Sequence, residues 1–347
     1  MQNNWIEFLS KQGATTDPAG NLVFGNTRKE IVDLQTNPTI ISLHHLGVAR
    51  VQGEDAQTFL QGQLTNDISL LGEAKIQLSG YCNPKGRMLA QFIIIPETEG
   101  FILLTPRSIF AKTINRLKMF VLRSKVEITD IGDDYTCIGF AGNGVETVLS
   151  NMIPGLPEQD FTLQAEPNHI IAKIPGTLPR YLVVTKITNA ISLWESQADK
   201  FSKAGPSAWH WLDIHAGLPV ILPETIEEFV PQMVNLELIG GVSFKKGCYT
   251  GQEIVARMHY LGKAKRRMFR LHQNEDTLPP PGADIFDAAG DTQSVGKVVI
   301  AEPAADGVDM LAVIQLSHVQ SDALHQGSPS GPQLKVESLP YSIDEKA

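Results

Sequence analysis

The stretch that decides the interpretation of this chain is Lys245-Lys246-Gly247-Cys248-Tyr249-Thr250-Gly251-Gln252-Glu253. Thr250 and Glu253 have the spacing of a capping box, which predicts a helix over residues 251–259. The free N–H groups of its first turn and the positive end of its dipole would then lie close to Cys248. These groups and the two preceding lysines favour the thiolate, which is the nucleophilic form of cysteine. We therefore predict that Cys248 is the catalytic residue.

The alternative for Cys248 is a small buried residue, which is the usual role of a free cysteine. That role is the one expected for Cys137, which lies in an apolar strand, and for Cys82, which ends a strand beside a turn. Three cysteines without a CxxC pair argue against a disulfide framework or a structural zinc site. No metal site is predicted.

The cysteine stretch opens a strongly basic segment, residues 245–270. The segment has a net charge of +7 in a chain whose net charge is −9, and Glu253 is its one acid. Its basic residues are Lys245, Lys246, Arg257, Lys263, Lys265, Arg266, Arg267 and Arg270. An anion should approach this region. Three interpretations remain open: a solvated linker, a site for the anionic tail of a small ligand, and a contact with RNA phosphates.

Hydrophobic periodicity predicts an α+β protein. Strands are expected at 47–52, 76–80, 88–95, 101–105, 126–128, 135–140, 170–174 and 181–185, and helices at 55–61, 107–121, 190–201 and 208–216. Asn83-Pro84-Lys85-Gly86 suits a β-turn that closes a hairpin. From residue 267 onward, short β runs separated by proline and glycine indicate a small closed β domain.

Two further segments have weaker patterns. Residues 1–40 are expected to form an arm lying on the body, and residues 219–241 to wrap its surface. The predicted domains are an α+β body of two subdomains over 1–262 and a β-barrel over 263–347.

The composition is that of an ordinary globular protein, with 42% hydrophobic and 19% charged residues. The first residues do not resemble a signal peptide, and the apolar runs are too short to cross a bilayer. The net charge of −9 argues against a surface that embraces nucleic acid as a whole. We expect a cytoplasmic monomer without membrane contact.

The octapeptide at 246–253, KGCYTGQE, resembles the signature of the YgfZ family of folate-binding proteins, which are relatives of the glycine-cleavage aminomethyltransferase. Other stretches resemble the bacterial members of that family over roughly residues 40–345. They are FLQGQLTND (59–67), NPKGRM (83–88), IHAGLPVI (214–221), PQMVNL (231–236) and LPYS (339–342).

The resemblance implies three subdomains around a folate-sized opening, with tetrahydrofolate or a one-carbon derivative as cofactor. Two tryptophans of the bacterial proteins are linked with folate, and a pterin stacks well on an aromatic face. One of them corresponds to Trp209 and the other to Leu46, which lacks the ring. Lys246 and Arg257, from the basic segment, and Tyr249 are the further candidates for folate contact; the two cations would meet the anionic glutamate tail.

The resemblance also implies a function. The protein would support iron–sulphur enzymes as clients through Cys248, and some of those enzymes modify tRNA, so that its link to tRNA would be indirect. A folate-dependent aminomethyltransferase is one alternative. That enzyme uses a carboxylate on the strand after the hairpin, where Ala90 stands here, so transferase activity of that type is not expected. A direct RNA-binding module is the other alternative, against which the overall acidity speaks.

Overall fold

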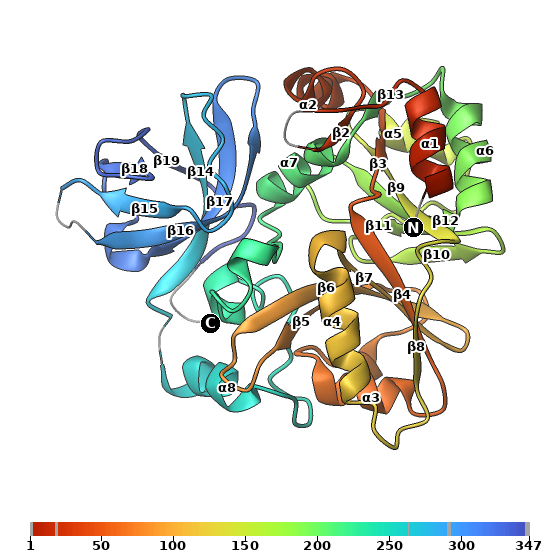
Figure 1. Cartoon of the computed structure of the whole chain (residues 1–347), viewed down its shortest axis with the longest axis horizontal. Helices are drawn as coiled ribbons and strands as arrows, with labels where there is room; N and C mark the ends of the chain where they lie inside the picture. The colour runs from red at the N-terminus through yellow and green to blue at the C-terminus, as the bar shows by residue number, and fades with distance from the viewer. Residues whose placement is uncertain (1–2, 18–19, 263, 290–292, 344–347) are drawn as a thin grey trace.

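The computed structural model describes residues 3–17, 20–262, 264–289 and 293–343 (Figure 1). Two sheets face each other across a shared apolar core, and a third sheet is formed by the C-terminal part of the chain. This is a mixed α/β architecture, as the periodicity predicted. Most of the expected strands and helices are confirmed within a few residues of their predicted bounds.

The first large sheet has six strands. In spatial order they are β10 (Leu163–Glu166), β11 (His169–Lys173), β12 (Arg180–Lys186), β9 (Tyr135–Ala141), β3 (Thr39–Ser42) and β13 (Ser202–Ala204). All neighbours are antiparallel except β13 and β3. Its central strands are buried on both faces, which explains their nearly continuous apolar sequence.

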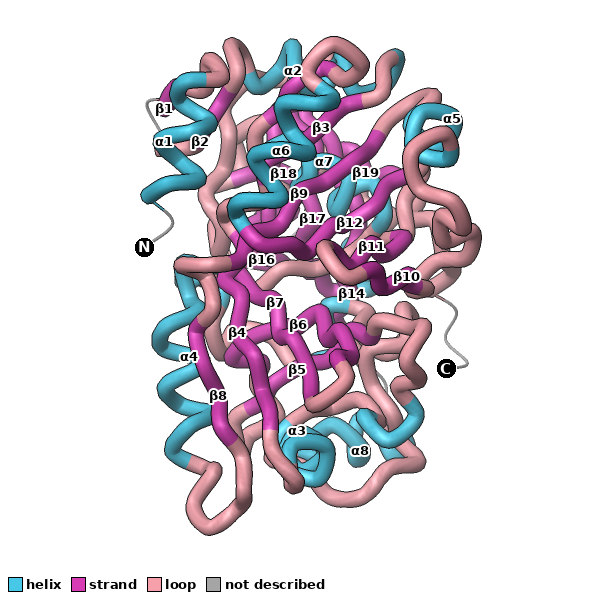
Figure 2. Tube along the Cα trace, turned by 90° about the vertical axis from the view of Figure 1, so that its right-hand side faces the viewer, coloured by secondary structure: helices cyan, strands magenta, loops and turns pink. Residues whose placement is uncertain are grey.

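The second sheet has five antiparallel strands. Their order is β5 (Gln77–Cys82), β6 (Met88–Glu97), β7 (Gly100–Pro106), β4 (Leu46–Gln52) and β8 (Glu127–Asp130). The expected turn between β5 and β6 is confirmed, because the Gly86 N–H donates to the Asn83 carbonyl over 2.9 Å. Figure 2 shows this sheet below the six-stranded one.

Helices cover the outer faces of both sheets. The six-stranded sheet carries α1 (Asn3–Lys11), α5 (Val145–Ser150) and α6 (Ile187–Gln197), and the five-stranded sheet carries α3 (Ala56–Gln63) and α4 (Arg107–Met119). Gly47 lets α4 approach β4, because a Cβ atom there would lie 2.2 Å from the Phe110 ring.

The N-terminal residues are not an arm on the surface. Trp5 and Leu9 of α1 are fully buried, and Trp5 packs edge-on against Trp194 of α6 at 5.7 Å between ring centroids. A short two-stranded sheet, β1 (Thr15–Thr16) with β2 (Leu22–Val23), and α2 (Thr27–Thr36) lead into β3, which is hydrogen-bonded on both sides. Residues 1–40 therefore contribute to the core of the body.

The segment 219–241 also differs from the expectation. Ile221, Phe229, Val234 and Leu236 are buried in the core behind the five-stranded sheet. The segment includes the short 3-10 helices η2 (Pro223–Thr225) and η3 (Pro231–Val234); η1 (Ile68–Leu70) and η4 (Leu316–His318) lie elsewhere. The segment is buried because it carries apolar side chains among its turn residues. These side chains have no regular spacing, so the sequence pattern did not reveal their burial.

The C-terminal sheet follows α8 (Gln252–Leu261). Its strands are, in order, β18 (Leu324–Gln326), β15 (Asp284–Asp287), β16 (Ser294–Pro303), β17 (Val308–Gln315), β14 (Arg266–Gln273) and β19 (Lys335–Glu337). One face of this sheet packs on the body. The other face covers a separate apolar core of the C-terminal part. The helix α7 (Pro206–Ala216) lies between this sheet and the six-stranded sheet.

Candidate functional site

Leu46 and Trp209 line one cavity. It has a volume of about 70 Å³ and lies where β4, β6 and β7 face α7. Its wall is mainly apolar and includes Leu78, Ile93 and Phe161. The structure therefore brings together the two positions that the sequence linked with folate, although they are more than 160 residues apart in the chain.

Two features of the six-stranded sheet hold the Trp209 ring in place. Gly139 of β9 makes room for it, because a Cβ atom there would lie 2.7 Å from the ring. The Arg180 guanidinium lies 4.8 Å from the ring centroid, and Asp213 binds that guanidinium at 2.7 Å. Arg180 is completely buried, so its charge requires this partner. Trp209 is thus fixed by packing and by a buried ion pair.

Three buried polar atoms of the cavity residues have no hydrogen-bond partner. They are Nδ1 of His45, Oε1 of Gln91 and Oγ1 of Thr105. Leaving such a group unpaired costs about 1–3 kcal/mol. A cavity with apolar walls and a few unpaired polar atoms is typical of a site for a small polar heterocycle.

The histidines around the cavity differ in the direction in which their pKa is shifted. Burial lowers the pKa of His45 well below its usual value, and burial together with Arg107 lowers the pKa of His44 to about 4. Both rings are therefore neutral near pH 7. Burial acts on His210 in the same direction, but the hydrogen bond to Glu302, at 3.0 Å, and the negative charges of Glu302 and Asp213 together outweigh burial and raise the pKa of His210.

These walls fit the chemistry of a pterin, which is a planar heterocycle edged with donors and acceptors. The enclosed volume is smaller than the ligand, because a cavity of about 150 Å³ holds a single benzene ring. Binding of a pterin here would therefore require outward movement of side chains in the wall. Four apolar residues of the wall, Leu46, Ile93, Phe161 and Val220, are only partly buried, so they have more room to move than the fully buried ones.

The strand β6 offers Gln91 to this cavity, whereas Ala90 is buried in the core behind the sheet. Successive side chains of a strand point to opposite faces, which explains the difference. The sequence comparison singled out Ala90; the polar residue of this strand at the cavity is its neighbour. The sequence signal that could have identified it is a single polar side chain, Gln91, within the otherwise apolar run 88–95.

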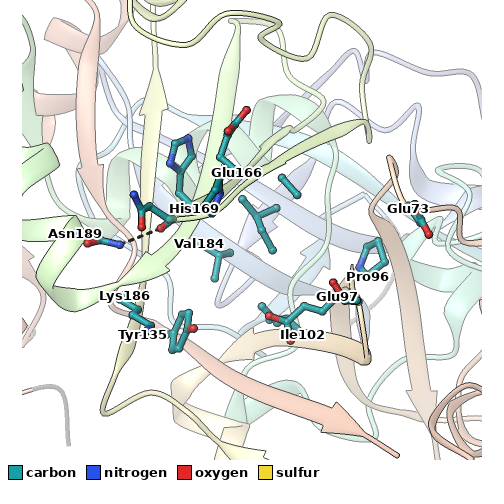
Figure 3. A pocket seen from close by; sticks show the side chains of 15 residues that line it. Glu73, Pro96, Glu97, Ile102, Tyr135, Glu166, His169, Val184, Lys186 and Asn189 are labelled. Atoms are coloured by element: carbon teal, nitrogen blue, oxygen red, sulfur yellow. Dashed lines mark hydrogen bonds between the residues drawn. The ribbon is translucent and has the colours of Figure 1, made fainter. Parts of the chain in front are cut away.

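A second cavity of about 540 Å³ opens at the edge of the same two sheets (Figure 3). Figure 3 shows Glu166, His169 and Lys186 on one side of it and Glu97 on the other. The glutamates of its wall are Glu73, Glu97 and Glu166, against one lysine. The negative charge of this wall would repel the anionic tail of a folate, although the volume of the cavity suits a small molecule.

Lys246, Tyr249 and Arg257 are not among the residues that line the Trp209 cavity. The Lys246 ammonium donates to the backbone carbonyls of Gln61, Leu64 and Asn66 at 2.6–2.8 Å, so its three hydrogens are all used. Burial lowers the pKa of Lys246 to about 8, and the negative charge of Asp67 acts in the opposite direction. The geometry gives this lysine an internal role.

Tyr249 packs beside that lysine, with Nζ of Lys246 at 5.2 Å from its ring centroid. Burial raises the pKa of Tyr249. Between these two buried residues, Gly247 and Cys248 are exposed. Cys82 and Cys137 are buried, as expected. The signature therefore presents its cysteine, and no other cysteine, at the surface.

The start of α8 corrects the predicted capping box. The helix begins at Gln252, its N-cap is Gly251, and no side chain caps it. Gly251 has φ +85°, which favours glycine, and a Cβ atom there would lie 2.5 Å from the Asn83 carbonyl oxygen. Close packing on the β5–β6 hairpin fixes this helix start. Cys248 lies one residue further from the helix than the sequence predicted.

The cations of the basic segment fall into two groups, those bonded within the protein and those exposed at the surface. Arg267 binds the Gln232 carbonyl and Glu237, and Arg270 hydrogen-bonds to His215 and to the Ser338 carbonyl. Lys245, Arg257 and Lys265 are exposed. Lys263 lies outside the described residues. The predicted cluster is thus partly an internal framework and partly a charged surface.

Two further findings bear on cofactors and surroundings. Within the described ranges, no three or more His, Cys, Asp or Glu side chains are grouped so as to hold a metal ion. Among the same residues, none of the helices is both long and apolar enough to cross a membrane.

Comparisons with known proteins agree with this architecture. Residues 7–181 match the family model described as GCVT N-terminal domain. A solved structure, the glycine cleavage system aminomethyltransferase T from Bartonella henselae, superimposes with a TM-score of 0.78 over 97% of this chain and 96% of that one. At 17% identity, this similarity shows the fold.

Two curated relatives are closer in sequence. The tRNA-modifying protein YgfZ of Enterobacter sp. (strain 638) is 31% identical over 92% of this chain and 98% of its own length. The protein of the same name from Escherichia coli O45:K1 (strain S88 / ExPEC) is 30% identical over 88% of this chain and 94% of its own length. The chain therefore belongs to the YgfZ family.

Proposed function

We propose that this protein binds a reduced folate, with the pterin in the Leu46–Trp209 cavity, and supports iron–sulphur enzymes through Cys248. One observation carries the folate part of this proposal. Two positions far apart in the sequence meet in one cavity that also contains three unpaired polar atoms. A pterin would satisfy these atoms and stack on Trp209.

The folate part is tested by titrating the protein with tetrahydrofolate and following tryptophan emission. Trp209→Leu should weaken binding by about two-fold to ten-fold, because an aromatic pair contributes about 0.5–1.5 kcal/mol. Trp194→Phe is the control, since Trp194 lies in the core with Trp5 on the other side of the six-stranded sheet. An unchanged affinity in Trp209→Leu would place the pterin elsewhere.

Cys248 would act at the surface rather than in the cavity. It is exposed between the buried Lys246 and Tyr249, so a client protein can reach its sulphur without any opening of the fold. Through clients that modify tRNA, this protein would influence tRNA indirectly. The curated relatives are named for tRNA modification, which supports this connection.

The thiol part is tested in cells that lack the native protein. Cys248→Ser keeps the size and polarity of the side chain but removes the ionisable sulphur, and it should fail to restore iron–sulphur enzyme activity. Folate binding by the purified variant should be unchanged. Full restoration by the serine variant would show that the thiol is dispensable.

Aminomethyl transfer is the rival activity. Ala90 is buried away from the cavity, and the residue of β6 at the cavity is Gln91, which carries an amide. The strand therefore supplies no carboxylate for the transfer. Release of formaldehyde from a one-carbon folate would favour the transferase over the accessory role.

We further propose a two-domain organisation, 1–262 and 263–347, and a cytoplasmic monomer. The C-terminal sheet would close into a barrel. Its edge strands β18 and β19 are linked through the residues beside them, because the Leu334 N–H donates to the Leu324 carbonyl over 2.8 Å and His325 forms a bridge with Gln333.

A further inference from the structure

A cluster of aromatic rings lies at the surface beside the end of α8. The rings of Phe244 and His259 stack, with 3.7 Å between their centroids and an angle of 8° between their planes. Tyr260 packs edge-on against both, at 6.1 Å and 4.8 Å. Tyr260 is 64% exposed and Leu261 is 84% exposed. Exposed large side chains that gather in one patch often mark an interaction site.

Exposed cations lie on α8 and on the segments that adjoin it. Lys245 follows Phe244 directly, Arg257 lies one helical turn before Tyr260 on the same face of α8, and all three residues Lys245, Arg257 and Lys265 are exposed. Lys85 joins them from the tip of the β5–β6 hairpin, which packs on α8 through Gly86 and Ile254. The acid on the exposed face of α8 is Glu253. The local charge is therefore positive in a chain of net charge −9.

We propose that this surface, formed by α8, Phe244 and the four exposed lysine and arginine residues, binds single-stranded RNA. Aromatic faces that stack on bases, together with cations that follow the backbone, are how proteins bind single strands without reading sequence. An acidic protein would need the cations but not the planar rings. The proposal goes beyond the folate and thiol functions and needs neither Cys248 nor the Trp209 cavity.

The number of cations on this surface predicts how the affinity for RNA depends on salt concentration. If Lys85, Lys245, Arg257 and Lys265 each neutralise one phosphate, the logarithm of the affinity should fall with the logarithm of the salt concentration with a slope of about −3. Loss of one ring that stacks on a base should weaken binding about ten-fold or more. The two effects are separable, because the first depends on salt and the second does not.

The experiment uses the full chain and a fluorescently labelled short oligouridylate, with binding followed by anisotropy over a range of salt concentrations. Tyr260→Ser should lose about ten-fold in affinity and keep the slope. Arg257→Glu with Lys265→Glu should weaken binding and reduce the slope by about 1.4. The matched control is Lys112→Glu with Lys200→Glu, an equal change of charge at exposed positions on α4 and just after α6. It should leave binding unchanged.

A competitor separates RNA from other polyanions. A polyglutamate peptide carries the same sign of charge without bases, so it should displace the oligouridylate only weakly. Three results would each overturn the proposal. They are an unchanged affinity in Tyr260→Ser, equal losses in the control and the α8 double variant, and displacement by polyglutamate as effective as by unlabelled RNA. An unchanged affinity in Tyr260→Ser together with effective displacement by polyglutamate would indicate a site for an acidic protein or tail. Circular dichroism would confirm that each variant is folded.

Discussion

Gln91 is the residue of the candidate site whose replacement separates function from stability most sharply. Its amide oxygen is buried in the Trp209 cavity and has no partner. If a ligand supplies that partner, the unliganded protein carries the cost of the unpaired oxygen. Gln91→Met keeps the length of the side chain and removes the polar group. We therefore expect the variant to be more stable than the parent protein and to bind folate less well.

The size of both effects follows from the hydrogen bond. An unpaired buried amide oxygen costs about 1–3 kcal/mol, so the free energy of unfolding should rise by about 1 kcal/mol or more. The hydrogen bond to the ligand contributes a net of about 1 kcal/mol, so its loss should weaken tetrahydrofolate binding about five-fold. A role in packing alone would give no gain of stability and no loss of affinity.

Urea denaturation followed by tryptophan fluorescence measures the first effect, and a tetrahydrofolate titration measures the second. Gln63→Met is the matched control. The amide oxygen of Gln63 is also buried and unpaired, but Gln63 lies on α3, away from the cavity. It should show the gain in stability and no change in affinity. A Gln91→Met protein that is less stable and binds folate normally would refute the argument.

Two further predictions concern the thiols and a carboxylate. At neutral pH an alkylating reagent should modify Cys248 before Cys82 and Cys137, because Cys248 is exposed, whereas burial raises the pKa of the other two thiols to about 12; peptide mass spectrometry that found Cys82 modified first would contradict this. Burial would raise the pKa of Asp309, but its hydrogen bonds, first of all from His215, outweigh burial and lower the pKa. The stability from this lowered pKa is present above the ordinary value of about 3.9 and lost as the pH falls below it. Urea unfolding between about pH 5 and pH 3 should show this loss in the parent protein and not in Asp309→Asn.

Part of the site could be predicted from the sequence, because some site residues lie within recognisable short stretches of the chain. The cysteine signature and the tryptophan position could be identified from residues next to them. The walls of the cavity could not, because Gln91 and Thr105 come from separate strands and His45 from the turn before β4, and they become neighbours only when the five-stranded sheet forms. Asp213 was within reach of inference, since it lies one helical turn after Trp209 on the same face of α7.

The fold was predicted where a segment has a clear period. β3 is four residues long and buried on every side, so it has no alternation to distinguish it from a loop in an arm. The helix start at Gly251 depends on contact with the hairpin, which no local pattern reveals. Both errors occurred where tertiary packing determined the local structure.

The signature lysine shows how the conspicuous stretches of this sequence work together. Lys246 was interpreted as a cation for a ligand, yet its three hydrogens go to carbonyls within FLQGQLTND (59–67), another of the stretches that carry the family resemblance. The tip of NPKGRM (83–88) packs on Gly251 within the same signature. Two separate stretches thus hold the short loop of the signature.

This arrangement gives Cys248 its setting. Residues on both sides of it are buried, and the helix that follows is fixed by the hairpin, so the sulphur is exposed on a rigid support rather than on a free loop. A thiol that only filled space would need no such support. The burial of Lys246 and Tyr249 around an exposed cysteine therefore favours a chemical role for Cys248, carried out on a partner that approaches from solvent.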